Sequence, residues 1–225
     1  MKLVYPEWEE PIPIEENQAF TISMENRSDY FRTVDILKQQ LETGEGPFHL
    51  YTDEDKELNL KKSMVLFLSP WNLDFHDRQL EKKLLGRLQE MAMDEDHYPK
   101  TQKILGSLLQ YLEELQEETP LNFTYDWEPV FSDICKALHL GLDDQSLTLP
   151  EKMLEYMRAW TELCGETCFV FNQFRAYLSE EERKSFYETA WGEKLPFLML
   201  EGACHDKIKE ERFFTIDEDY CQFFE

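Results

Sequence analysis

Short, continuous apolar runs separated by helical patterns are the feature that most limits what this chain can fold into. The runs cover residues 63–68, 168–171, 195–200 and 212–216. A run of this length with few polar residues is typical of a strand that is buried on both faces. Buried strands that alternate with helices form a parallel or mixed sheet with helices packed on its faces. We therefore expect an α/β fold.

Two long helical patterns interrupt this alternation after Pro70. Leucines recur at helical spacing over Asp77–Met93 and again over Tyr98–Glu118, and only the short link Asp94–His97 separates the two patterns. Long helices joined by a short link predict an antiparallel helical hairpin. We expect an α/β head made of residues 1–69 and 147–225, interrupted by an α-helical leg at residues 70–146.

The charge of the chain is strongly acidic. Lysine and arginine number 23 against 47 aspartate and glutamate, a formal net charge of −24. Such a surface repels polyanions and argues against a nucleic-acid partner. Net charge does not fix where the charges lie, however, and several basic residues are grouped near the expected leg. They permit phosphate contacts, and they are equally compatible with ordinary surface charge: Lys61, Lys62, Lys82, Lys83, Arg87, Lys100 and Lys103.

The sequence predicts a cytoplasmic protein with no membrane partner. The apolar runs are far shorter than the ~20 residues of a membrane-spanning helix, and the N-terminal residues lack the apolar region of a secretory signal. The five cysteines are an odd number without a C-x-x-C pair, and we expect free thiols. Cys204 and His205 are adjacent but isolated from other metal ligands, which favours neither a metal site nor a catalytic pair.

The motifs of nucleotide-binding enzymes are missing. A phosphate-binding loop of the form G-x-x-x-x-G-K-[ST] does not occur, and no glycine lies in the expected strand-to-helix turn at residues 24–28. The patterns G-x-G-x-x-G and G-x-S-x-G are also missing. We therefore expect no ATP binding and no enzymatic activity.

Carboxylates are concentrated at the end of the second long helical pattern. Glu113–Glu118 contains four of them, and Asp126 and Glu128 follow shortly after. Oxygen ligands from a helix end and a nearby loop suit Ca²⁺ or Mg²⁺, although the same pattern is typical of a solvated acidic face. A metal-dependent nuclease is a further alternative, but no histidine or lysine lies near these acids in the sequence.

Four segments in a characteristic order carry a family resemblance. They are EEPIPI at residues 9–14, EKMLEYM at 151–157, CFVFN at 168–172 and IDEDY at 216–220. In order, spacing and total length the chain resembles the Csn-two family, the spacer-acquisition accessory protein of type II-A CRISPR loci. The similarity extends over nearly the whole chain, including the helical insertion.

The resemblance implies a head related in shape to P-loop ATPases but without a functional phosphate loop, and a helical leg. It also implies a homotetrameric ring that binds the ends of double-stranded DNA, a structural calcium ion, and action with the CRISPR integrase complex and the RNA-guided effector nuclease in bacteria. Lys100 matches a lysine of the family, and Glu118 and Asp126 match acids near the calcium ion. Asn122 and Thr124 stand where the family has acids, and Trp127 stands in place of a glutamate.

We therefore predict a non-enzymatic protein that binds DNA ends without sequence preference. The predicted DNA-binding residues are Lys61, Lys62, Lys100 and Lys103. The predicted calcium ligands are Glu117, Glu118, Asn122, Thr124, Asp126 and Glu128. The alternatives are an acidic protein-interaction module without a DNA role, and a metal-dependent nuclease.

Overall fold

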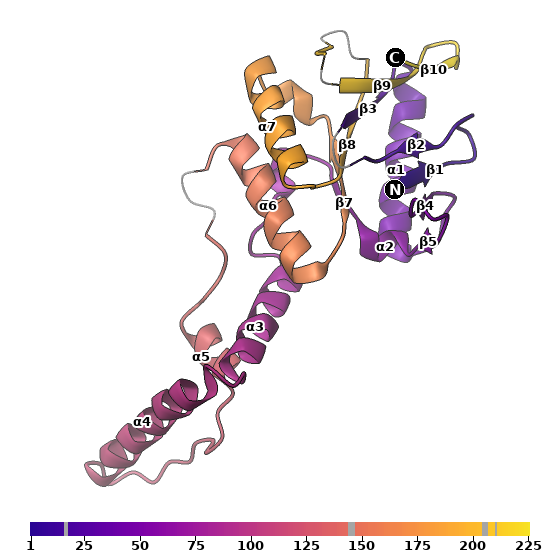
Figure 1. Cartoon of the computed structure of the whole chain (residues 1–225). Helices are drawn as coiled ribbons and strands as arrows, with labels where there is room; N and C mark the ends of the chain where they lie inside the picture. The colour runs from indigo at the N-terminus through magenta and orange to yellow at the C-terminus, as the bar shows by residue number, and fades with distance from the viewer. Residues whose placement is uncertain (16–17, 144–146, 204–206, 210) are drawn as a thin grey trace. The chain divides into compact units, whose positions relative to one another are not determined.

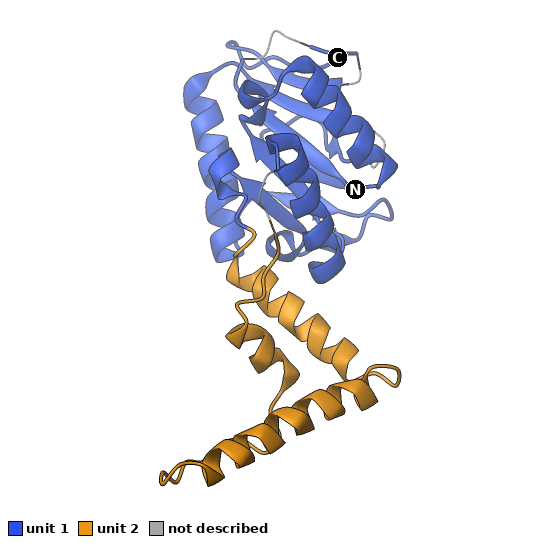
Figure 2. Ribbon diagram, turned by 90° about the vertical axis from the view of Figure 1, so that its left-hand side faces the viewer, with its two compact units in different colours: residues 1–74, 144–225 blue, residues 75–143 orange. Residues whose placement is uncertain are grey.

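The chain divides into two compact units, which we call the head and the leg (Figure 2). The computed structural model describes residues 1–15, 18–143, 147–203, 207–209 and 211–225. The head comprises residues 1–74 and 144–225, and the leg comprises residues 75–143. The leg thus begins at Phe75 and ends at Asp143, a few residues inside the predicted limits of 70 and 146.

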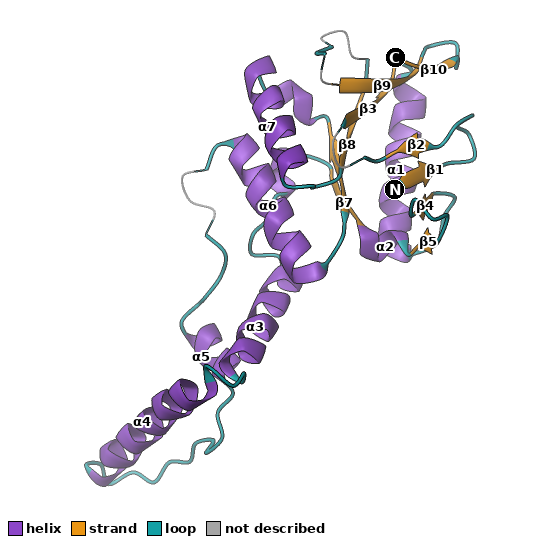
Figure 3. Cartoon of the chain, in the orientation of Figure 1, coloured by secondary structure: helices purple, strands orange, loops and turns teal. Residues whose placement is uncertain are grey.

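Two sheets and four α-helices build the described part of the head (Figures 1 and 3). The strands are β1 (Lys2–Val4), β2 (Ile12–Pro13), β3 (Ala19–Met24), β4 (His49–Tyr51), β5 (Glu57–Leu58), β6 (Met64–Phe67), β7 (Cys168–Asn172), β8 (Phe197–Glu201), β9 (Glu211–Ile216) and β10 (Gln222–Phe224). The helices are α1 (Arg27–Thr43), α2 (Leu60–Ser63), α6 (Leu149–Cys164) and α7 (Glu180–Gly192), with 3₁₀ turns η1 (Pro70–Asn72) and η2 (Phe174–Tyr177).

The larger sheet has the strand order β10-β9-β3-β8-β7-β6. Its strands run parallel except β10, which pairs antiparallel with β9. A smaller antiparallel sheet has the order β2-β1-β4-β5. Helices α6 and α7 cover one face of the larger sheet, and α1 and the smaller sheet lie on the other (Figure 1). The prediction of an α/β fold is confirmed, with each of the four apolar runs forming a strand of the parallel core.

Aromatic side chains fill the space between the larger sheet and its two helices. Phe67 of β6 contacts Tyr156 of α6, with ring centroids 5.0 Å apart. Phe171 of β7 contacts Phe186 of α7 at 5.9 Å, and Phe186 in turn contacts Phe197 of β8 at 5.0 Å. All five rings are buried. Because burying such a ring stabilises a fold by roughly 1.5–3 kcal/mol, this layer is a major part of the head's stability.

The helices of the head begin where the sequence indicates. Ser179 precedes α7, its hydroxyl accepts a hydrogen bond from the backbone N–H of Glu182, and the Glu182 carboxylate accepts one from the backbone N–H of Ser179. This reciprocal pair of hydrogen bonds is a capping box. Thr148 and Glu151 form a second capping box at α6.

The leg contains three helices, α3 (Arg78–Ala92), α4 (Tyr98–Glu117) and α5 (Phe131–Ala137). Helix α3 packs against α5, and the Gln89 side chain accepts a hydrogen bond of 3.0 Å from the backbone N–H of Ser132. The predicted antiparallel hairpin of α3 and α4 is therefore wrong. The two helices were predicted correctly, but helical periodicity identifies an apolar face and not the element that covers it.

No helix in the described part of the chain is long and apolar enough to cross a membrane. Four cysteines lie in this part, and none of them forms a disulfide. Cys168 is fully buried in β7, and this burial raises the pKa of its thiol to about 12. The Cys204–His205 pair lies outside the described residues.

Candidate nucleic-acid interface

The turn from β3 to α1 occupies the place where a nucleotide-binding α/β protein would have its phosphate loop. Here Asn26 caps the helix, and its side-chain oxygen accepts hydrogen bonds from the backbone N–H groups of Ser28 at 3.0 Å and Asp29 at 3.1 Å. Those groups are among the donors that would otherwise face a bound phosphate. The first turn also contains the Asp29 carboxylate, which accepts a hydrogen bond of 2.6 Å from the Arg32 guanidinium. This geometry supports the expectation that the head binds no ATP, which stays a prediction.

Lys61 and Lys62 are neighbours on the single turn of α2. The Lys61 ammonium donates a hydrogen bond of 2.5 Å to the backbone carbonyl of Glu42, in the last turn of α1. A cation at that end of a helix is favourable because the carbonyl groups there carry partial negative charge. Lys61 thus has a structural role in the head. Lys62 is exposed and makes no ion pair with a described residue.

Lys100 and Lys103 lie in the first turns of α4, both exposed to solvent. Neither forms an ion pair within the described residues. Their position is unfavourable for the helix itself, since the N-terminal end of a helix carries partial positive charge. The last turns of the same helix contain Glu113, Glu114 and Glu117, where carboxylates are again unfavourable. Helix α4 therefore carries its charges in the reverse of the order that would stabilise it.

The structure places the four predicted lysines in two groups. Lys61 and Lys62 belong to the head, and Lys100 and Lys103 belong to the leg. Within each unit the two lysines are close together, and each pair is exposed. That these lysines bind DNA stays a prediction.

Further basic residues lie on α3; Lys82, Lys83 and Arg87 were recognised in the sequence as compatible with phosphate contacts but were not among the four predicted DNA-binding residues. Arg78, Lys82, Lys83 and Arg87 are all exposed, and Glu81 is the only acid among residues 78–87. In a chain with a net charge of −24 such a cluster is unusual, and its composition was visible in the sequence. The position of Arg78 at the start of α3 and the arrangement of the four side chains around the helix come from the structure.

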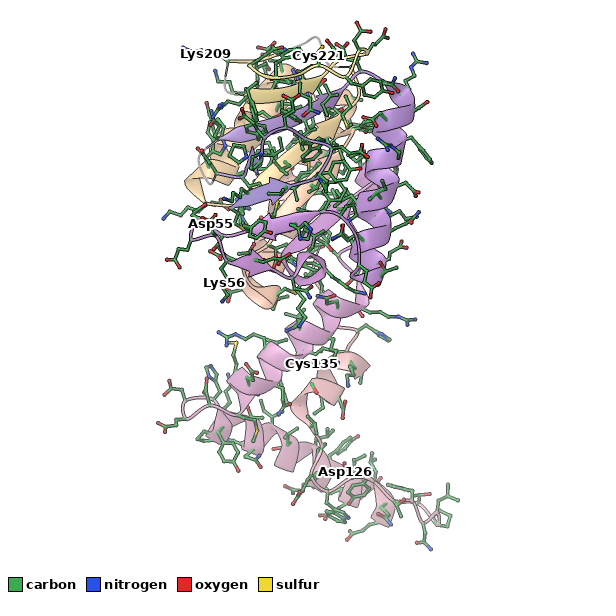
Figure 4. The ribbon with its side chains drawn as sticks, turned by 90° about the vertical axis from the view of Figure 1, so that its right-hand side faces the viewer. Asp55, Lys56, Asp126, Cys135, Lys209 and Cys221 are labelled. Carbon is green, nitrogen blue, oxygen red and sulfur yellow. The ribbon has the colours of Figure 1, made fainter. Side chains whose placement is uncertain are left out.

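The predicted calcium ligands do not converge within one chain. Glu117 and Glu118 end α4, and the remaining four lie along the segment that leads to α5, all of them exposed. Asp126, labelled in Figure 4, accepts a hydrogen bond of 3.0 Å from the backbone N–H of Glu128. Among the described residues, no three His, Cys, Asp or Glu side chains are grouped as a metal site requires. Calcium takes six to eight oxygen ligands, more than the described acids of a single chain bring together here, and calcium binding stays a prediction.

Helix α4 also carries an exposed apolar stripe, which consists of Ile104, Leu108, Tyr111 and Leu115. These residues lie three or four positions apart and therefore on one face of the helix. Tyr111 is 55% exposed and Leu108 is 42% exposed, whereas Leu105 on the neighbouring face is buried. The leg thus leaves apolar surface without a partner in its own described residues, which is the pattern of an interaction site.

A buried ionic cluster in the head escaped the sequence analysis. The Arg175 guanidinium lies 2.8 Å from the Glu211 carboxylate, and the Tyr187 hydroxyl donates a hydrogen bond to the same carboxylate. Burial raises the pKa of Glu211 and that of Tyr187. The cluster connects η2, α7 and β9, and its residues are buried, so its role is to position these elements.

Comparison with known proteins identifies the family. Residues 40–220 match the model of the family Cas_Csn2, described as CRISPR-associated protein. The chain belongs to this family. It therefore has a CRISPR-associated role, and the resemblance noted in the sequence is confirmed. No curated protein sequence matches the chain.

One solved structure shares the fold of this chain. The crystal structure of Stu0660 of Streptococcus thermophilus matches with a TM-score of 0.57 at 13% identity, over 96% of this chain and 74% of that chain. A nucleotide-free ATP-binding cassette from an ABC transporter matches with a TM-score of 0.42 at 15% identity, over 92% and 78% of the two chains. The ADP conformation of MJ1267, an ATP-binding cassette of an ABC transporter, matches with a TM-score of 0.43 at 14% identity, over 92% of this chain and 79% of that chain. The two cassette similarities support no conclusion about nucleotide binding.

Proposed function

We propose that this Csn-two-family chain is a non-enzymatic DNA-binding protein. In this proposal it acts in spacer acquisition as a homotetrameric ring that holds the ends of double-stranded DNA without sequence preference. Its partners are the integrase complex and the RNA-guided effector nuclease in the bacterial cytoplasm. The family membership supports the CRISPR-associated role, and the DNA contact is argued from the charges of the leg.

The observation that carries the proposal is the placement of Lys100 and Lys103. Both are exposed, neither has an acidic partner among the described residues, and both occupy the end of α4 where cations are least favourable. A chain with twice as many acids as bases would neutralise such lysines easily if stability alone mattered. Their placement is explained if they contact the phosphates of a partner, since lysine binds phosphate as a mobile point charge.

The exposed stripe on α4 supports assembly. Residues 104, 108, 111 and 115 form a continuous apolar face, as in helices that pack against another helix. Assembly gathers several copies of a −24 chain, and the resulting self-repulsion must be overcome by burial of this kind of surface. A symmetric assembly also repeats the lysine pairs around its axis, which concentrates positive charge that the single chain lacks.

A mobility-shift experiment with linear and closed circular duplexes tests the proposal. The test variant combines Lys61→Gln with Lys62→Glu, Lys100→Glu and Lys103→Glu. Glutamine at position 61 retains an N–H donor on the side that faces the Glu42 carbonyl, so we expect only a small cost in the stability of the head. We expect the wild type to bind linear duplex in preference to circular duplex, and the variant to lose binding while its melting temperature changes little.

A matched control separates local from overall charge. Lys38, Lys56, Lys136 and Lys209 are exposed and lie outside both lysine pairs; Lys56 and Lys209 are labelled on the head in Figure 4. The control changes one of these to Gln and three to Glu, so that its net charge equals that of the test variant. Equal loss of binding in both would show that net charge is responsible. No binding by the wild type would leave the chain an acidic protein-interaction module, and cleavage of the duplex would favour a nuclease.

A further inference from the structure

Helix α3 presents a basic face to solvent. Arg78, Lys82, Lys83 and Arg87 are exposed, and of these only Arg87 has a carboxylate in reach among the described residues, that of Glu90 at 3.8 Å. Glu81 points elsewhere on the helix, where its carboxylate lies 3.7 Å from His76. Three of the four cations are therefore not neutralised by the described part of the chain.

The periodicity of the helix gathers these cations on one side. At about 100° per residue, the four basic positions fall within one half of the circumference. The other half contains the leucines Leu80, Leu84, Leu85 and Leu88, of which Leu80 is fully buried. Helix α3 thus has one side that packs within the leg and one side that is basic, with Gln79 and Gly86 between the charged residues.

Gly86 has no explanation within the leg. It lies in the interior of α3, where glycine weakens a helix relative to alanine. It does not adopt a left-handed conformation, and a Cβ atom at this position would meet no atom within 4 Å. Neither the backbone nor the packing of the described residues therefore requires a glycine. Around the helix, Gly86 lies between the directions of the Lys82 and Lys83 side chains. Because glycine has no side chain, a bulky partner can approach the helix closely at this point.

We propose that the basic face of α3, formed by Arg78, Lys82, Lys83 and Arg87 around Gly86, binds the phosphate backbone of double-stranded DNA. This inference rests on the proposed function and extends it to a second helix of the leg. It assigns Gly86 as the point of closest approach. The contact is with phosphates and therefore carries no sequence preference.

The dimensions of the face fit a phosphate backbone. Arg87 lies nine positions after Arg78, which at a rise of about 1.5 Å per residue spans about 14 Å. One strand of a duplex places a phosphate about every 3.4 Å along its axis, so about four phosphates fall within that span. Four cations in the same length match that number. An acidic protein surface has no such fixed spacing, which is why we favour DNA over a protein partner.

The decisive experiment measures how DNA affinity depends on salt. The variant Arg78→Gln, Lys82→Gln, Lys83→Gln, Arg87→Gln removes the four charges and keeps good helix-forming residues. Each phosphate contact contributes about 0.9 to the slope of log affinity against log salt. We expect the slope for a linear duplex to be smaller than that of the wild type by about 3.6 between 50 and 200 mM salt. Far-UV circular dichroism checks that the helices are retained.

A charge control and two substitutions of Gly86 complete the experiment. Replacing Lys38, Lys56, Lys136 and Lys209 by Gln removes the same number of charges elsewhere, and we expect a slope close to that of the wild type. Gly86→Gln adds bulk without charge at the centre of the face, and we expect weaker binding at an unchanged salt slope. Gly86→Ala is the companion variant, which should raise the melting temperature.

The outcomes separate this inference from the proposed function. If the wild type binds duplex and the α3 variant has the same salt slope as the wild type, the inference is wrong. The proposed function would then rest on Lys100 and Lys103. A wild type that does not bind duplex at all would overturn the proposed function. An α3 variant that changes the assembly in sedimentation but binds as much DNA per chain would make the face a protein contact, and the inference would be wrong.

Discussion

The head and the leg place their apolar side chains differently. In the head, the strands and the facing sides of α6 and α7 are buried in a continuous aromatic layer. In the leg, α4 is 20 residues long, yet among the hydrophobic residues of this helix only Leu105 is buried, and a whole apolar stripe is exposed. The head thus buries its apolar side chains within itself, whereas the leg has exposed apolar side chains that only a partner can bury. This difference suggests that the head provides stability and the leg provides contacts.

Truncation of a core side chain should have the largest effect on stability. Phe171→Ala in β7 removes a fully buried ring that contacts Phe67, Phe174 and Phe186. We expect a loss of about 3–5 kcal/mol in the free energy of unfolding, measured by urea denaturation.

The matched truncation in the leg is Leu108→Ala. Its side chain is 42% exposed, so we expect a change within about 0.5 kcal/mol. We also expect weaker assembly, observed as a shift toward lower mass in sedimentation. A destabilisation as large as that of Phe171→Ala would mean that α4 is part of a self-contained core, and the contrast between head and leg would not hold.

The strands of the head could be predicted from the sequence because their burial is visible in their own residues. A strand buried on both faces is a continuous apolar run, and the runs that become β6, β7, β8 and β9 were all recognised. Capping boxes are equally local signals, and residues 148–151 and 179–182 form them at the starts of α6 and α7. Strand β10 was missed, because three residues after an acidic turn give little periodicity.

The leg could be predicted only in part. The extents of α3 and α4 follow from helical spacing, but the partner of an apolar face is a property of tertiary structure. The leucines of α4 were therefore assigned to a hairpin that does not form. The candidate lysines were chosen for their composition, and the structural role of Lys61 became visible only through its hydrogen bond to Glu42. The buried Arg175–Glu211 pair joins residues far apart in the sequence and leaves no local signal.

The effect of calcium on assembly tests the contrast between the head and the leg. The carboxylates of one chain do not group into a metal site among the described residues, so a calcium effect requires ligands from a second chain. We expect millimolar Ca²⁺ to strengthen assembly relative to EDTA and Mg²⁺, by about 2.7 kcal/mol at a hundred times the dissociation constant. The melting temperature of dilute, dissociated chain should not change. Identical sedimentation in all three buffers would leave these carboxylates a solvated acidic face.

The cap of α1 gives a small expected effect. Asn26→Ala removes the acceptor for two backbone N–H groups, and we expect a loss of about 1 kcal/mol in the free energy of unfolding. The turn still lacks a glycine-rich phosphate loop, so neither this variant nor the wild type should bind ATP in equilibrium dialysis. ATP turnover that is lost with a mutation in the head would contradict the non-enzymatic assignment.

Sedimentation velocity of the full chain with a fluorescent linear duplex tests the central claim most directly. One experiment reports both assembly and DNA occupancy, the two contacts assigned to the leg. We predict an assembly of four chains that co-sediments with the duplex at 50 mM salt, releases it at high salt, and dissociates when Leu108 is replaced by Asp. A single chain that sediments separately from the duplex at every salt concentration would contradict the account.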